Sequence, residues 1–92
     1  MYEILLYDYV EGFVERRAPY RQQHLALARE FAERGHMVMA GAFAEPTDGA
    51  ALVFRSDEPG QAAAFAERDP YVKNGLVTSW RARKWTVVIG GE

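Results

Sequence analysis

His24 and Asp69, which lie far apart in the sequence, are the side chains best suited to acid–base chemistry in this chain. An imidazole titrates near neutral pH, and a carboxylate hydrogen-bonded to one ring nitrogen fixes which nitrogen carries the proton. The other ring nitrogen can then take a proton from a bound molecule or return one to it. Such chemistry requires a fold that brings the two residues into contact.

Asp69 precedes Pro70 and Tyr71 at the end of a segment with helical character. The helix dipole disfavours a carboxylate at that end, and the residue before a proline avoids helical backbone angles. We therefore expect Asp69 to turn out of the helix. An aspartate before a proline is also a good N-cap for a short following turn, here through Asn74. Capping is the structural alternative to a role in chemistry, although one carboxylate oxygen can cap while the other faces a ligand.

Two arginines accompany His24 at helical spacing. Arg17, Arg21 and His24 are separated by four and three residues, which places them on one side of a helix. Guanidinium groups bind carboxylates through two parallel hydrogen bonds, so these arginines could form the rim of an anion site. Tyr71 could point its hydroxyl at the same site or pack in the core. The alternatives are a solvated basic face for the arginines and a buried structural ring for His24.

The elements that position these residues follow from the pattern of apolar residues. Short apolar runs bounded by turn residues predict strands, and the three- and four-residue spacing from Tyr20 to Phe31 predicts a helix. Pro19 belongs to the first turn of that helix or to a loop ahead of it, and Gly35 ends it. We expect strands at 2–10, 36–44, 50–55 and 76–89, and helices at 15–34 and from a cap at Ser56 or Asp57 to Arg68.

The predicted order of elements is β-α-β-β-α-β. Right-handed crossovers then give a ferredoxin-like α+β fold, with a four-stranded antiparallel sheet and two helices on one face. The 92 residues are expected to form this single domain, residues 1–92.

The second face of the predicted sheet is also apolar. Ile4 and Leu6 share one face of the first strand, and Met37, Met39 and Phe43 share one face of the second. Leaving this face in water would expose a patch larger than the few hundred Å² usual for a monomer. We therefore expect a homodimer packed sheet to sheet with two-fold symmetry. A monomer with an exposed apolar face is the alternative.

The composition excludes several kinds of partner and site. A net charge of −2 argues against nucleic acid or an anionic membrane as the main partner. The absence of cysteine excludes disulfides, thiolate zinc sites and a cysteine nucleophile. No leader-like N-terminus or membrane-length apolar run is present, so we expect a cytoplasmic protein. No paired-histidine spacing, phosphate loop or nucleophile elbow occurs, so we expect neither a metal nor a cofactor.

Several runs of this sequence resemble the YciI-like family of small proteins. They are Arg21-Gln22-Gln23-His24-Leu25, the strand entry from Gly35 to Gly41, the Asp48-Gly49 turn, and Asp69-Pro70-Tyr71 followed by Gly75-Leu76-Val77. The resemblance spans nearly the whole chain and implies the dimeric α+β barrel fold, in which ferredoxin-like units pair through their sheets. It also implies a site at His24 and Asp69, with Arg21 matching a common family arginine. Arg17 matches no family motif.

Two functions remain open at this point. In the first, the protein is a lyase- or isomerase-type enzyme for a small anionic or cyclic substrate. His24 transfers a proton, Asp69 orients its ring, and Arg21 holds an anionic oxygen. Tyr71 would close a cleft between the helix ending at Arg68, the sheet and the partner chain. In the second, the protein is a non-catalytic small-ligand-binding or accessory module. Related barrels include isomerases, lyases and oxygenases, so the fold alone fixes no reaction.

Overall fold

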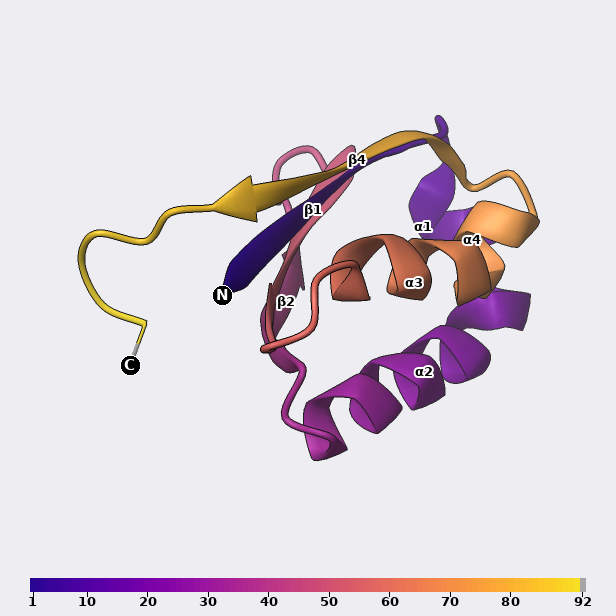
Figure 1. Ribbon diagram of the computed structural model, residues 1–92. Coiled ribbons are helices and arrows are strands. Elements are labelled where there is room, and N and C mark those ends of the chain that lie inside the picture. Colours follow the sequence, from indigo (N-terminus) through magenta and orange to yellow (C-terminus); the bar gives the residue numbers. More distant parts are fainter. Residues whose placement is uncertain (92) are drawn as a thin grey trace.

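The computed structural model describes residues 1–91, which form one four-stranded antiparallel sheet in the order β2-β3-β1-β4. Its two longer helices lie on one side of this sheet (Figure 1). The strands are β1 (Tyr2–Tyr9), β2 (Met37–Ala42), β3 (Gly49–Arg55) and β4 (Val77–Trp85). The helices are α1 (Phe13–Arg16), the 3₁₀ helix η1 (Ala18–Tyr20), α2 (Arg21–Glu33), α3 (Gln61–Arg68) and α4 (Pro70–Lys73). The ferredoxin-like α+β prediction is confirmed. None of the helices within residues 1–91 is long and apolar enough to cross a membrane.

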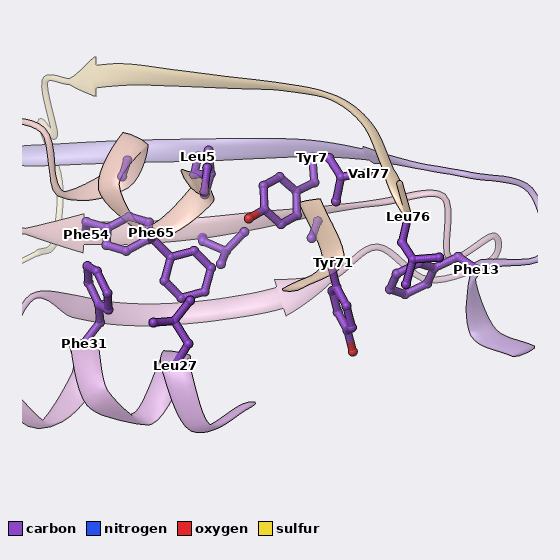
Figure 2. Packing of buried hydrophobic residues seen from close by; sticks show 14 residues of the cluster. Leu5, Tyr7, Phe13, Leu27, Phe31, Phe54, Phe65, Tyr71, Leu76 and Val77 are labelled. Atoms are coloured by element: carbon purple, nitrogen blue, oxygen red, sulfur yellow. The ribbon is translucent and has the colours of Figure 1, made fainter. Parts of the chain in front are cut away.

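The core lies between the sheet and the two longer helices. Leu27 and Phe31 of α2 point toward Phe54 of β3 and Phe65 of α3 (Figure 2). The ring centroids of Phe31 and Phe65 are 5.3 Å apart in an edge-on arrangement, and those of Phe31 and Phe54 are 6.0 Å apart. This geometry is favoured by the ring quadrupoles and adds to the gain from burying the rings. The cluster fixes α2 and α3 against the same face of the sheet.

The predicted continuous helix over residues 15–34 is interrupted. Residues 13–16 form α1, Pro19 lies in η1, and α2 begins only at Arg21. Pro19 has no N–H to donate, and its ring clashes with the preceding turn of an α-helix, so a continuous helix cannot pass through it. Gly35, with φ of 79°, follows the helix end as predicted.

The start of α3 differs from the prediction, because neither Ser56 nor Asp57 caps it. The residue before α3 is Gly60, which has the left-handed φ of 95°. Its N–H and that of Ala62 donate to the Glu3 carboxylate over 2.8 Å and 3.0 Å. Free N–H groups at a helix start require acceptors, and here a strand at the centre of the sheet supplies them. Glu3 therefore ties β1 to the start of α3.

A register shift corrects the predicted faces of the second strand. Between Met37 and Met39 the β2–β3 ladder contains an irregularity, with Met37 opposite Phe54 and Met39 opposite Val53. Phe54 is buried beneath the helices, so Met37 packs on that side while Met39 faces the open side of the sheet. The prediction that Met37 and Met39 share a face is wrong because the extra residue, Val38, reverses the alternation.

The last strand is shorter than predicted and ends at Trp85. Tyr2 pairs with Trp85, so β1 has no residues left to pair with the chain beyond that point. The following segment leaves the sheet and loops round, as Figure 1 shows in yellow, and the Tyr2 hydroxyl donates a hydrogen bond to the Gly91 carbonyl. Val88 and Ile89 in this segment are 86% and 90% exposed.

The Glu3 contact predicts that Glu3→Ala lowers the free energy of unfolding by about 1–2 kcal/mol, since two N–H groups at the start of α3 lose their acceptor. Urea unfolding measures the change. Glu67→Ala, on the exposed side of the same helix, serves as the control and should stay within about 0.5 kcal/mol of the parent. Equal stability of the two variants would show that the Glu3 contact does not stabilise the helix.

Candidate functional site

The Asp69 carboxylate is fully buried, with 0% of the residue exposed. Its Oδ1 accepts a hydrogen bond from the backbone N–H of Tyr71 at 3.0 Å and lies 2.9 Å from His24 Nδ1. Its Oδ2 accepts a hydrogen bond from the Tyr7 hydroxyl at 2.7 Å. A carboxylate can be buried in its charged form only when such donors replace water. Both oxygens are therefore held by the surrounding chain.

The local sequence places Asp69 between two helices. Asp69 follows α3 with extended backbone angles, φ of −70° and ψ of 122°, and is the N-cap of α4 with Pro70 at the helix start. The turn out of the helix and the cap are both as predicted. The hydrogen-bond partners of the two carboxylate oxygens differ from the expectation that one oxygen caps the helix while the other faces a ligand. Oδ1 serves the cap and His24 together, and Oδ2 contacts Tyr7.

The contact with Asp69 defines which nitrogen of His24 carries a proton. Because a carboxylate can only accept hydrogen bonds, Oδ1 accepts from His24 as well as from the Tyr71 N–H, and Nδ1 is the donor. The Nε2 atom then holds a lone pair, and no side chain or backbone group within residues 1–91 hydrogen-bonds to it. The ring is 15% exposed and stacks on Tyr71 with centroids 4.0 Å apart and planes within 10°. Packing and hydrogen bonding thus hold the ring in one orientation.

A cavity of about 240 Å³ lies beside the ring, between α2 and the strands β2 and β3. Its walls are aromatic on one side and made of small residues on the other. The lining residues that matter here are Tyr9, Phe13, Arg17, Arg21, His24 and Tyr71, facing Ala40, Gly41 and Ala42 of β2. No residue of α3 lines it, so the cleft expected beside the helix ending at Arg68 lies instead under α2.

Arg17 and Arg21 both line this cavity, although they do not share a helix as their spacing suggested. Arg17 precedes η1, whereas Arg21 is the first residue of α2. Neither is ion-paired with an acidic side chain within residues 1–91. Burial raises the pKa of Tyr71, and the positive charges of both arginines oppose that rise. The positive charges of the two guanidinium groups therefore favour the ionised form of the Tyr71 hydroxyl. This hydroxyl points away from the packed core rings in Figure 2.

Three site residues are not among those proposed from the sequence: Tyr7, Tyr9 and Phe13. The Tyr9 and Phe13 rings stack with centroids 3.5 Å apart, and Phe13 meets the Tyr71 ring edge-on at 5.2 Å. Alternation along a strand puts Tyr7 and Tyr9 on the same face of the first strand, and a buried tyrosine hydroxyl requires a partner. That partner, 62 residues away, could not be identified from this signal.

Tyr7 is 1% exposed and remains a neutral donor. Burial, and then the negative charge of Asp69, raise the pKa of Tyr7 far above its ordinary value. Burial also raises the pKa of Tyr9, which lines the cavity. Within residues 1–91 there is no cluster of three or more histidine, aspartate or glutamate side chains that could hold a metal ion.

The fold and this site define a small α+β domain with a buried carboxylate–histidine pair beside a cavity. The chain belongs to the YCII-related domain family, whose sequence profile matches residues 1–86, in agreement with the resemblance noted above. No curated protein sequence matches the chain.

Several solved structures match the chain, and two of them illustrate the shared fold. One is 5-chloro-2-hydroxyhydroquinone dehydrochlorinase (TftG) from Burkholderia phenoliruptrix AC1100 in complex with 2,5-dihydroxybenzoquinone. It is 18% identical, with a TM-score of 0.76 and 94% of each chain covered. The other is protein Atu4242 from Agrobacterium tumefaciens, which is 13% identical with a TM-score of 0.61, covering 95% of this chain and 92% of that one. At these identities the likeness establishes the common fold.

The neutral state of Tyr7 predicts an alkaline limit to stability. The folded protein keeps Tyr7 protonated because burial raises its pKa, whereas the unfolded chain ionises this phenol near its ordinary pKa of about 10. The contribution of Tyr7 to the free energy of unfolding is therefore complete below that pH and is lost as the pH rises beyond it. We expect Tyr7→Phe to lose stability less steeply in this range than the parent.

Denaturant unfolding at a series of alkaline pH values measures this slope, and tyrosinate absorbance follows ionisation in the same samples. The absorbance difference between the parent and Tyr7→Phe should appear only as the parent unfolds. A tyrosinate signal from Tyr7 in protein that is still folded would contradict the prediction.

Proposed function

We propose that this protein is a small-molecule enzyme in which His24 and Asp69 carry out general acid–base chemistry of the lyase or isomerase type. The observation that supports the proposal most directly is the 2.9 Å contact between His24 Nδ1 and the fully buried Asp69 carboxylate. This contact leaves Nε2 as the proton acceptor in a ring that lines the cavity. The same contact explains why the imidazolium formed during the reaction is stable, since the carboxylate lies beside it.

In the proposed reaction, His24 Nε2 takes a proton from a substrate carbon or hydroxyl, and the bonding electrons move onto a substrate oxygen. Arg21 and Arg17 stabilise that oxyanion, because both guanidinium groups line the cavity without an acidic partner in residues 1–91. The imidazolium then returns the proton to another substrate atom in an isomerase. In a lyase it gives the proton to the leaving group. Tyr71 holds the His24 ring by stacking and contributes its hydroxyl to substrate binding.

The substrate is proposed to be a small anionic or cyclic molecule. The cavity of about 240 Å³ is larger than the ~150 Å³ cavity that is known to hold benzene, so it admits one substituted six-membered ring. Aromatic side chains on one wall offer a surface for stacking, and the arginines select negative charge. The similar fold of TftG holds 2,5-dihydroxybenzoquinone, a molecule of this size and shape.

We further propose that the protein acts as a homodimer packed through the open face of the sheet. Ile4 of β1 lies between Val53 of β3 and Arg83 of β4, and Val53 also neighbours Met39 of β2. Two residues further along β1, Leu6 lies between Ala51 of β3 and Arg81 of β4 on the same face. No helix within residues 1–91 covers this face, and Met39 is 66% exposed. A second copy would remove these apolar side chains from water.

The acid–base proposal predicts that His24→Ala and Asp69→Asn each lower turnover by about 10²- to 10⁴-fold, because the proton acceptor or its orientation is lost. The assay is a panel of small cyclic hydroxy acids, enols and hydroquinones, followed by mass spectrometry. His36→Ala is the matched control, since this second histidine lies outside the cavity lining and should leave turnover unchanged.

Full turnover in both site variants, on a compound that the parent converts, would refute the acid–base role. A compound that raises the melting temperature through His24 and is recovered unchanged would instead favour the ligand-binding module. Thermal shift and recovery of the compound distinguish these results.

The dimer proposal predicts that Val53→Glu converts the protein to monomers, because a charge is placed in the middle of the apolar face. Light scattering during size-exclusion chromatography measures the mass. Val14→Glu, at a valine of α1 that is 47% exposed and away from the sheet, should remain dimeric. A parent protein that is monomeric at micromolar concentration would exclude the proposal.

A further inference from the structure

We propose that Tyr7 is a positioning residue for the His24–Asp69 pair, holding Asp69 Oδ2 so that Oδ1 faces His24 Nδ1. The importance of this for turnover rests on the function proposed above. The effect of Tyr7 on the ring, however, can be measured without any substrate.

The geometry assigns one carboxylate oxygen to Tyr7. The Tyr7 hydroxyl donates to Asp69 Oδ2 over 2.7 Å, and no other group within residues 1–91 hydrogen-bonds to Oδ2. Both residues are buried, with 1% of Tyr7 and 0% of Asp69 exposed. Rotation of the carboxylate would break this bond together with those to Tyr71 and His24. Tyr7 therefore restricts the direction in which Oδ1 points.

The sheet holds Tyr7 itself in place. Tyr7 lies in β1, an inner strand, and is paired with Ala50 of β3 on one side and Trp80 of β4 on the other. A donor on a strand paired on both sides is fixed more tightly than one on a loop. Burial and the charge of Asp69 keep its hydroxyl protonated, so it is a donor throughout the neutral pH range.

Tyr7 must also affect how the pair binds its proton. When His24 is neutral, Asp69 carries an uncompensated negative charge and the bond from Tyr7 is at its strongest. When the ring is protonated, the imidazolium shares that charge and the same bond is weaker. Tyr7 therefore stabilises the deprotonated pair more than the protonated pair. Removing its hydroxyl should make the pair take up its proton at a higher pH.

Other titratable and charged groups also face this pair. They are Arg17 and Arg21 from the segment leading into α2, Tyr9 from β1 and Tyr71 from α4. All four are retained in the variants below, so differences between the variants report on the Tyr7 hydroxyl.

The test is an NMR titration of the His24 ring in Tyr7→Phe. We expect the midpoint to rise by about 0.5–1 pH unit, since only part of a charge-assisted hydrogen bond distinguishes the two protonation states. Tyr20→Phe is the matched control, because Tyr20 is half-buried, lies outside the cavity lining and makes no hydrogen bond with Asp69. Its His24 midpoint should equal that of the parent.

A second variant is expected to shift the His24 midpoint in the opposite direction. A ring-fluorinated tyrosine at position 7 keeps the shape and is a stronger donor, so the His24 midpoint should fall below that of the parent. This variant tests the positioning role of Tyr7 if Tyr7→Phe fails to fold. An unchanged midpoint in the folded position-7 variants, accompanied only by a lower melting temperature, would overturn the proposal and leave Tyr7 a structural residue. Shifted midpoints with full turnover in His24→Ala would instead reject the proposed function and retain the positioning role.

Discussion

The burial of the Asp69 carboxylate is the constraint on which the rest of this structure depends. A charged group without water is tolerated only if protein donors surround it, and removing one partner of such a group costs several kcal/mol, about 3–5. Its donors come from β1, α2 and the start of α4. The sheet, the first long helix and the turn after α3 must therefore be in place together before the carboxylate is satisfied.

The aromatic rings that line the cavity also hold the His24 ring beside the buried Asp69 carboxylate. A row of ring contacts runs from Tyr9 to Phe13, from Phe13 to Tyr71, and from Tyr71 to His24. These contacts link β1, α1, α4 and α2. The His24 ring is thus held on one edge by the Asp69 carboxylate and on one face by the Tyr71 ring. The ring also lines a cavity together with Arg17 and Arg21. Packing that stabilises the fold and packing that orients the imidazole are the same contacts.

The shared fold with a dehydrochlorinase does not decide the reaction of this protein. At 18% identity the similarity establishes the arrangement of strands and helices, and one such arrangement supports many chemistries. The proposed function therefore depends on side chains, above all on the Nε2 lone pair of His24 and on Arg17 and Arg21, which form no ion pair within residues 1–91. The volume of the cavity restricts the size of the ligand but does not identify it.

The sequence alone determined the order of the elements, the α+β class and the cap at Asp69, because apolar periodicity and proline geometry act over a few residues. The sequence also identified His24, Asp69 and the two arginines as candidate site residues by their type and spacing. Only the tertiary structure showed that Glu3 caps α3, that a register shift turns Met37 toward the helices, and that the cavity lies under α2. It alone revealed Tyr7 as the partner of Asp69. These features are contacts between distant segments, and such contacts are set by the register of the sheet and the packing of helices on it, which local residue patterns do not encode.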